Sequence, residues 1–164
     1  MDSTGKRSAS EMRGVEQEVS LRILVRRPPR GVAFALQRGA AELIEPRVAS
    51  PDALVFDFTV RVGTTAVAGA PRFLGAFTQG PPSARFVYVN SGKRAGQPTS
   101  VWDRRAKVSL AGISMAMVTE ASRTREARVE TEMEGIGPDG GPVCATVKSV
   151  IWRVGRGPDR ARAI

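Results

Sequence analysis

A chain of 164 residues, 41% hydrophobic and 25% charged, is long enough for one domain with a buried core. The lack of histidine excludes histidine-based nucleophilic catalysis and histidine metal sites, and the single cysteine excludes an internal disulfide and structural zinc. No apolar run approaches the roughly 20 residues of a membrane span, and the N-terminus lacks the apolar core of a secretory signal, so we expect a cytoplasmic protein.

The net charge of +9 is unevenly distributed along the chain. Residues 1–30 and 153–164 each carry three excess positive charges, and the remaining three belong to residues 31–152. Within this interior, residues 71–112 hold seven basic side chains against one acid. Since most of the excess lies in terminal segments, the total charge is weak evidence for nucleic-acid binding. The basic part of the fold itself is residues 71–112.

Both ends of the chain are predicted to be disordered tails. Residues 1–17 are rich in Ser, Gly and charge and show no apolar period, and residues 155–164 form a short basic tail. Between them we expect a single β-rich domain over residues 18–154.

Alternation of apolar and polar residues predicts most of the strands. The clearest pattern covers residues 53–62, where Leu54, Phe56 and Phe58 share one face while Asp57 and Thr59 share the other. Strands are expected at residues 19–26, 31–38, 53–62, 85–90, 106–110 and 143–154.

One helix is predicted over residues 114–126, with Ser114 as its N-cap. We expect this helix to be short, because the stretch lacks a broad apolar stripe. Residues 126–132 fit an edge strand equally well. Residues 138–141 are typical of a tight turn that leads into the last strand. Many short strands, Gly- and Pro-rich loops and scarce helix together predict a mainly β fold, a single antiparallel β-sandwich or flattened barrel.

Three motifs favour structural interpretations over functional ones. Residues 135–140 match the G-x-G-x-x-G string of dinucleotide sites, but the 24 residues that follow leave no room for the required helix and strand. Glu130, Glu132 and Glu134 would share one face of an extended chain, where they suit a hard cation or simply a charged edge strand. Cys144 lies in a predicted strand, which favours a packing role.

Residues 71–112 combine Pro/Gly-rich loops with arginines and five of the nine aromatic residues. Such a segment can form a recognition surface in which rings pack against a ligand and guanidinium groups bind its carboxylate or phosphate. The alternative is that the aromatic residues belong to the core and the arginines are solvated. The candidate ligand-binding residues are Arg85, Tyr88, Lys93, Arg94, Trp102, Arg104 and Arg105.

Blocks of the sequence resemble a bacterial family of unknown function. The strings RILVRRPPRGVAFALQRG, FDFTVRVG, PRFLGAFTQGPPSARFVYVNSG, AGQPTSVWDRRAKVSLAGIS and GPDGGPVCATVKSVIW are similar to successive blocks of the domain-of-unknown-function family 5990. The resemblance extends from about residue 21 to residue 154. It implies one domain in a bacterial, cytoplasmic protein, and it brings no activity, cofactor or catalytic residue.

We expect a small, non-catalytic binding or accessory module. Loops around residues 79–83 and 90–105 would hold an anionic small molecule or an acidic protein surface. No cofactor, metal or membrane contact is predicted, and the oligomeric state stays open. RNA or single-stranded DNA binding is a weaker alternative, because Phe86 and Tyr88 share a face but no second aromatic ladder accompanies them.

A second alternative is an enzyme that works without histidine, of the lyase or isomerase type, in the mouth of a β-barrel. Tyr88, Lys93 or Asp103 would then act as the acid or base, and Arg85 or Arg105 would bind the anionic group of the substrate.

Overall fold

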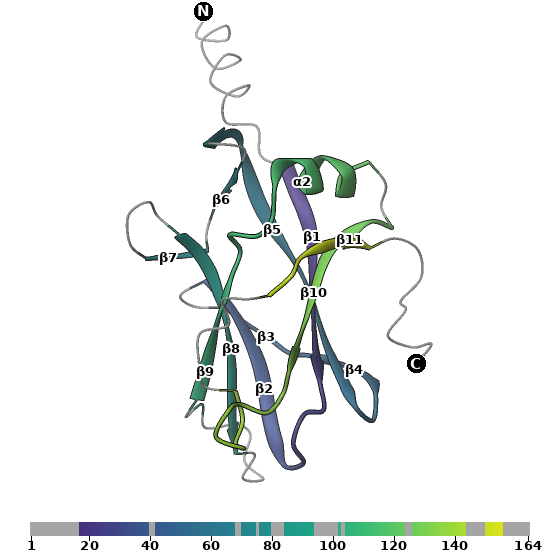
Figure 1. Cartoon of the computed structure of the whole chain (residues 1–164), viewed down its shortest axis with the longest axis vertical. Helices are drawn as coiled ribbons and strands as arrows, with labels where there is room; N and C mark the ends of the chain where they lie inside the picture. The colour runs from purple at the N-terminus through teal and green to yellow at the C-terminus, as the bar shows by residue number, and fades with distance from the viewer. Residues whose placement is uncertain are drawn as a thin grey trace, which may run out of the picture.

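The computed structural model describes residues 17–39, 42–67, 70–74, 76–79, 84–93, 102, 104–123, 126–143 and 150–155. These residues form two β-sheets that pack face to face, with one short helix at an end of the sandwich (Figure 1). Of the two predicted architectures the sandwich is confirmed, because within the described residues the sheets stay separate and open.

The first sheet contains six strands, and its long central strands are β1 and β5. Neighbouring strands are antiparallel, except that β1 and β10 run parallel. Residues 126–132 do contribute to a strand, β10, but the expected position at the edge of a sheet is wrong, since β10 lies between β1 and β11. In spatial order the strands are β11 (Arg153–Gly155), β10 (Arg128–Glu134), β1 (Gln17–Arg26), β5 (Ala53–Val67) and β4 (Arg47–Ser50), and β6 (Ala70–Leu74) also pairs with β5.

The second sheet contains five antiparallel strands arranged around β8. Its strands are β3 (Glu42–Ile44), β2 (Val32–Gly39), β8 (Ala84–Lys93), β7 (Phe77–Gln79) and β9 (Arg104–Ser109). Strand β8 pairs with β2, β7 and β9, so residues far apart in sequence meet across it.

The predicted strands form because their alternation places one apolar row toward the core. In the β1–β5 pair, Leu21 lies opposite Phe58 and Ile23 lies opposite Phe56, and all four side chains are buried. The intervening positions point away from the core, as at Arg22, which lies opposite Asp57. A period of two residues thus places the apolar row on the inner side and the Arg22–Asp57 pair on the outer side.

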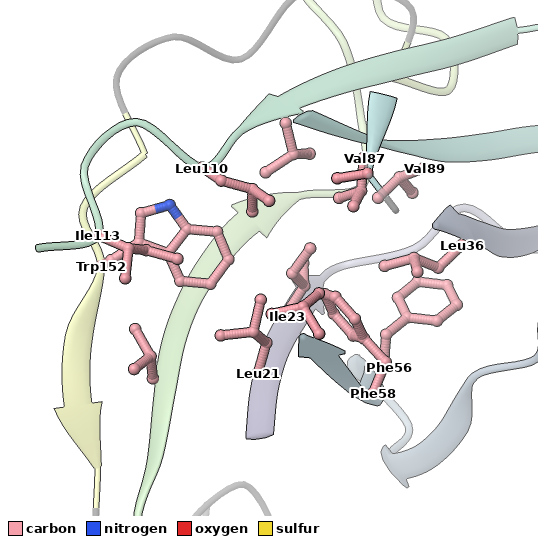
Figure 2. Packing of buried hydrophobic residues seen from close by; sticks show 14 of the residues in the cluster. Leu21, Ile23, Leu36, Phe56, Phe58, Val87, Val89, Leu110, Ile113 and Trp152 are labelled. Atoms are coloured by element: carbon pink, nitrogen blue, oxygen red, sulfur yellow. The ribbon is translucent and has the colours of Figure 1, made fainter. Parts of the chain in front are cut away.

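The core is filled by side chains from both sheets and from the segment that closes one end (Figure 2). Burial of each large side chain contributes about 1.5–3 kcal/mol. Trp152 closes the end of the core and donates a hydrogen bond from Nε1 to the carbonyl of Ser109 at 3.0 Å, which links the two sheets. The labelled core residues are Leu21, Ile23, Leu36, Phe56, Phe58, Val87, Val89, Leu110, Ile113 and Trp152.

The single helix of the described residues is α2 (Met115–Ala121), shorter than the predicted 114–126. Ser114 caps it as predicted, because its Oγ accepts a hydrogen bond from the amide N–H of Met117 at 3.2 Å. Helix α2 buries Val118 and Ala121 and packs beside β1, β10 and β11. Two buried residues make a narrow apolar face, as the lack of a broad apolar stripe in the sequence indicated.

The predicted tight turn at residues 138–141 is confirmed. The amide of Gly140 donates to the carbonyl of Gly137 at 3.0 Å, and Gly140 has a φ of 82°, a conformation that favours glycine. After this turn, the carbonyl of Val143 accepts a hydrogen bond from Ser91 Oγ at 3.4 Å. Residues 135–143 therefore connect the first sheet to the second.

The C-terminal part differs from the predicted strand at residues 143–154. Within its described portion, residues 150–152 are outside any strand, and β11 covers only Arg153–Gly155. Cys144 and the predicted tail residues 1–16 and 156–164 lie outside the described residues. In the part of the chain that is described, no helix has the length and apolar character to cross a membrane.

Candidate functional site

Strand alternation divides the candidate residues between the two sides of the second sheet. Along β8, Val87 and Val89 point into the core, so Arg85 shares the inner side while Tyr88 lies on the outer side. Along β9, the adjacent residues Arg104 and Arg105 alternate in the same way, with Arg105 exposed on the outer side. The candidates therefore lie in two groups.

The outer group begins with two cations that lie over two aromatic rings. Cζ of Arg105 is 4.4 Å from the centroid of the Tyr88 ring, and Nζ of Lys107 is 4.6 Å from the centroid of the Phe86 ring. The two rings meet edge to face, with centroids 5.2 Å apart and an interplanar angle of 74°. Because Arg105 is the cross-strand partner of Asn90 and Lys107 that of Tyr88, each cation reaches diagonally along β8 to its ring.

Two amide side chains extend this surface toward β2. Gln37 is the cross-strand partner of Tyr88, and Asn90 is the partner of Ala35, so both amides lie on the outer side. Nδ2 of Asn90 donates to Oε1 of Gln37 at 3.3 Å. Asn90 is only 2% exposed, and within the described chain its Oδ1 has no hydrogen-bond partner.

We call this surface the cationic aromatic face. It consists of Gln37, Phe86, Tyr88, Asn90, Arg105 and Lys107.

The spacing of its two cations suits an anion. Arg105 and Lys107 are two residues apart on one strand, so their Cα atoms are about 7 Å apart. Both side chains are on the same side of β9, so one carboxylate or phosphate above the strand can accept charge-assisted hydrogen bonds from both. This face can therefore bind an anion between two side chains that the rings already support.

The inner group makes contacts within the protein. Nη1 of Arg85 donates to the carbonyl of Ala76 at 3.3 Å. Nη1 of Arg104 pairs with Oδ2 of Asp139 at 2.7 Å, which attaches the turn at residues 138–141 to β9. The hydrogen bond from Arg104, aided by the amide of Gly141, holds the pKa of Asp139 below its ordinary value. Arg85 and Arg104 thus stabilise loops of the sandwich.

The remaining candidates are only partly described. Lys93 is the last residue of β8 and the cross-strand partner of Val32, and Trp102 is half-buried just before β9. Arg94, Asp103 and the loop residues 80–83 and 94–101 lie outside the described residues. The roles of Lys93 and Asp103 as acid or base therefore stay predictions.

The outer side of the first sheet also carries arginines, but there they contact carboxylates. Arg26 binds Glu132 through two hydrogen bonds, at 3.0 and 3.2 Å, which raise the pKa of Arg26 above its ordinary value. Asp57 binds both Arg22 at 2.7 Å and Arg47 at 2.8 Å. We call this surface the arginine–carboxylate lattice: it comprises Arg22, Arg26, Arg47, Arg128, Asp57, Glu130 and Glu132.

Ion pairs with arginines, in the lattice and next to it, explain the row of glutamates on β10. Each forms an ion pair: Glu130 with Arg128 at 2.9 Å, Glu132 with Arg26 at 3.0 Å and Glu134 with Arg27 at 2.6 Å. Among the described residues, no group of three or more Asp, Glu, Cys or His side chains is placed to hold a metal ion. The carboxylates of this row therefore pair with arginines, on a strand that lies inside the sheet and not at its edge.

Four residues of the cationic aromatic face were absent from the predicted site: Gln37, Phe86, Asn90 and Lys107. A period-two signal was present, since Phe86 and Asn90 flank Tyr88 at two residues on β8, and Lys107 follows Arg105 at two residues on β9. Gln37 had no signal of this kind, because its place beside Tyr88 depends on the pairing of β2 with β8.

Comparison with known protein families gives one match. The model of a family of unknown function, DUF5990, matches residues 19–155, which includes both sheets and the helix. No match was found among curated proteins or among solved structures. The chain belongs to the DUF5990 family, as its sequence blocks indicated.

Proposed function

We propose that the protein is a non-catalytic module that binds a small anionic molecule on the cationic aromatic face. Arg105 and Lys107 bind the carboxylate or phosphate of the ligand, and Tyr88 and Phe86 support the two cations from beneath. The observation that carries this proposal is the repeated contact of a cation with a ring, at 4.4 and 4.6 Å, on one side of the second sheet.

The rings favour binding by ordering the cations in advance. Fixing a long basic side chain costs up to about 2 kcal/mol of side-chain entropy. A cation–π contact at an exposed site contributes about 0.5–1 kcal/mol, so part of that cost is met before the ligand arrives. A guanidinium group over a ring also keeps its N–H donors in its own plane, where a carboxylate or phosphate can bind them.

The location in the chain gives independent support. Residues 71–112 are the strongly basic part of the interior, and β8 and β9 both lie within this segment. A locally positive surface raises the concentration of anions near it, most strongly at low ionic strength.

The test is a titration with two anions that carry no other functional group, succinate and propyl phosphate, followed by the backbone and side-chain NMR signals of β8 and β9. Two charge-assisted hydrogen bonds of about 2 kcal/mol each correspond to a Kd of about 1 mM. The double variant Arg105→Gln/Lys107→Gln should weaken binding tenfold or more.

The matched control is Arg72→Gln/Arg123→Gln, which lowers the net charge by the same amount at two exposed residues outside the second sheet. We expect the control to change the affinity less than twofold. Equal weakening in both double variants would show that the anions respond to total charge, and the proposal would then be wrong. Absence of binding in the unaltered protein would also contradict it.

A further inference from the structure

The cationic aromatic face contains an acceptor that the protein leaves unsatisfied, and this narrows the class of ligand. We infer that the ligand carries, beside its carboxylate or phosphate, a hydroxyl group that donates a hydrogen bond to Oδ1 of Asn90. This inference rests on the proposed function, because it assigns a second contact to the same ligand.

The first step concerns the burial of Asn90. Its side chain is on the outer side of β8, between the positions of Ala35 and Arg105 on the neighbouring strands, and it is 2% exposed. Oδ1 is the buried side-chain atom without a hydrogen-bond partner among the described residues. A buried carbonyl without a donor bears the full cost of leaving water, so such groups are rare unless something else binds them.

The second step concerns the orientation of the amide. Nδ2 of Asn90 donates to Oε1 of Gln37 at 3.3 Å, which makes Oδ1 the open end of the amide. The open end can only accept a hydrogen bond, so the missing partner must be a donor. A carboxylate or a fully ionised phosphate supplies no donor and cannot satisfy this atom.

The third step explains why Arg105 is not that donor. Arg105 is the direct cross-strand partner of Asn90, so the two Cβ atoms are about 5 Å apart. Its guanidinium group lies instead over the ring of Tyr88, which is two residues before Asn90 on β8 and on the same side of the sheet. The acceptor and the nearest cation are therefore adjacent but unconnected, as in a site that binds two different groups of one ligand.

These positions define the chemistry of the ligand. The hydroxyl and the anionic group must be separated by only a few atoms, because Asn90 and Arg105 are neighbours and Lys107 lies one strand position farther. The donor must also be small, since it reaches an atom below the surface. Hydroxy acids and phosphate esters of small polyols meet both conditions.

The experiment compares two matched pairs of ligands that differ by hydroxyl groups: malate with succinate, and glycerol 3-phosphate with propyl phosphate. Affinities are measured by NMR titration of the full chain. In at least one pair the hydroxylated member should bind about tenfold more tightly, and the pair that shows this identifies a carboxylate or a phosphate ligand. In the variant Asn90→Leu the ratio of affinities within that pair should fall to about one.

A second measurement needs no variant. The side-chain amide signals of Asn90 should move on addition of the hydroxylated anion and stay in place with its partner that lacks the hydroxyl. Equal affinities within both pairs, or a preference that survives in Asn90→Leu, would overturn the inference while leaving the proposed function intact. Absence of binding by all four anions would instead contradict the proposed function, and the inference with it.

Discussion

The outer sides of the two sheets use basic side chains in different ways. In the arginine–carboxylate lattice of the first sheet, Asp57 binds two arginines, Arg22 and Arg47. On the second sheet, Arg105 and Lys107 lie over aromatic rings. Charge that is paired within the lattice stabilises the fold, whereas under the proposed function the charge of Arg105 above its ring binds an external anion.

Strand β9 shows the same contrast in two adjacent residues. Arg104 points to the inner side and pairs with Asp139 at 2.7 Å, and Arg105 points to the outer side and lies over Tyr88. Residue type and sequence context are nearly the same for both. Alternation along the strand decides which arginine holds a loop and which is placed to bind a ligand.

The largest expected effect comes from breaking the lattice at its least exposed carboxylate. Arg128 and Glu130 form an ion pair with side chains 9% and 14% exposed. Glu130→Gln should lower the free energy of unfolding by about 2 kcal/mol, because it leaves a largely buried guanidinium group without its counter-charge. Urea denaturation measures this. Glu45→Gln, at an exposed residue, is the control and should change stability by less than about 0.5 kcal/mol.

On the second sheet, replacing a buried polar side chain by an apolar one should raise the free energy of unfolding. Asn90→Leu removes an unsatisfied buried acceptor, so we expect the free energy of unfolding to rise by about 1 kcal/mol. The matched change on the first sheet is Thr131→Val, because Thr131 Oγ1 donates to the carbonyl of Ile151 at 2.7 Å. That variant should lose about 1 kcal/mol. If both variants lose stability equally in urea denaturation, Asn90 is not an unsatisfied site.

A smaller effect tests whether the ring supports the cation. Tyr88→Leu removes the ring beneath Arg105 and should weaken binding of succinate or propyl phosphate about threefold, the equivalent of a surface cation–π contact. Tyr88→Phe keeps a ring and should stay within twofold of the unaltered protein. NMR titration of both variants gives the comparison. Equal affinities in the two variants would mean that the ring does not order Arg105.

The smallest effect is a pH dependence at the inner arginine of β9. The pKa of Asp139 is lowered from its ordinary value of 3.8, chiefly by the hydrogen bond from Arg104. The folded state then holds its proton less tightly than the unfolded chain, so the stabilisation is complete above the ordinary pKa and is lost as the pH falls through the lowered value. Asp139→Asn should therefore be less stable than the unaltered protein at pH 7 and equally stable at strongly acidic pH. Thermal unfolding across this range would contradict the account if the difference persisted in acid.

Much of the fold could be predicted because the long strands show the alternation of a half-buried sheet. Strands β1, β2, β5 and β8 all lie where the pattern predicts them. Strands β3, β4, β6 and β7 contain only three to five residues each, too few to show a period. The parallel pairing of β1 with β10 was also missed, because it joins residues more than 100 positions apart and no local signal specifies it.

The candidate site was predicted in part for a related reason. Tyr88 and Arg105 were both candidates, and the structure brings them together. The segment from residue 90 to residue 105 was expected to be a loop, yet β8 continues to Lys93 and β9 begins at Arg104. Without the ends of these strands, alternation could not be used to separate the inner Arg104 from the outer Arg105.

The most direct test of the central claim compares one arginine from each sheet. Arg26→Gln, in the lattice, and Arg105→Gln, on the cationic aromatic face, remove the same charge. Unfolding in urea and titration with succinate and propyl phosphate are measured for both. We predict that Arg26→Gln loses about 0.5–1 kcal/mol of stability with unchanged affinity, and that Arg105→Gln loses most of the affinity while its stability falls by no more than the similar contribution of a surface cation–π contact. The claim is contradicted if both variants weaken anion binding alike, or if Arg105→Gln binds the anions as tightly as the unaltered protein.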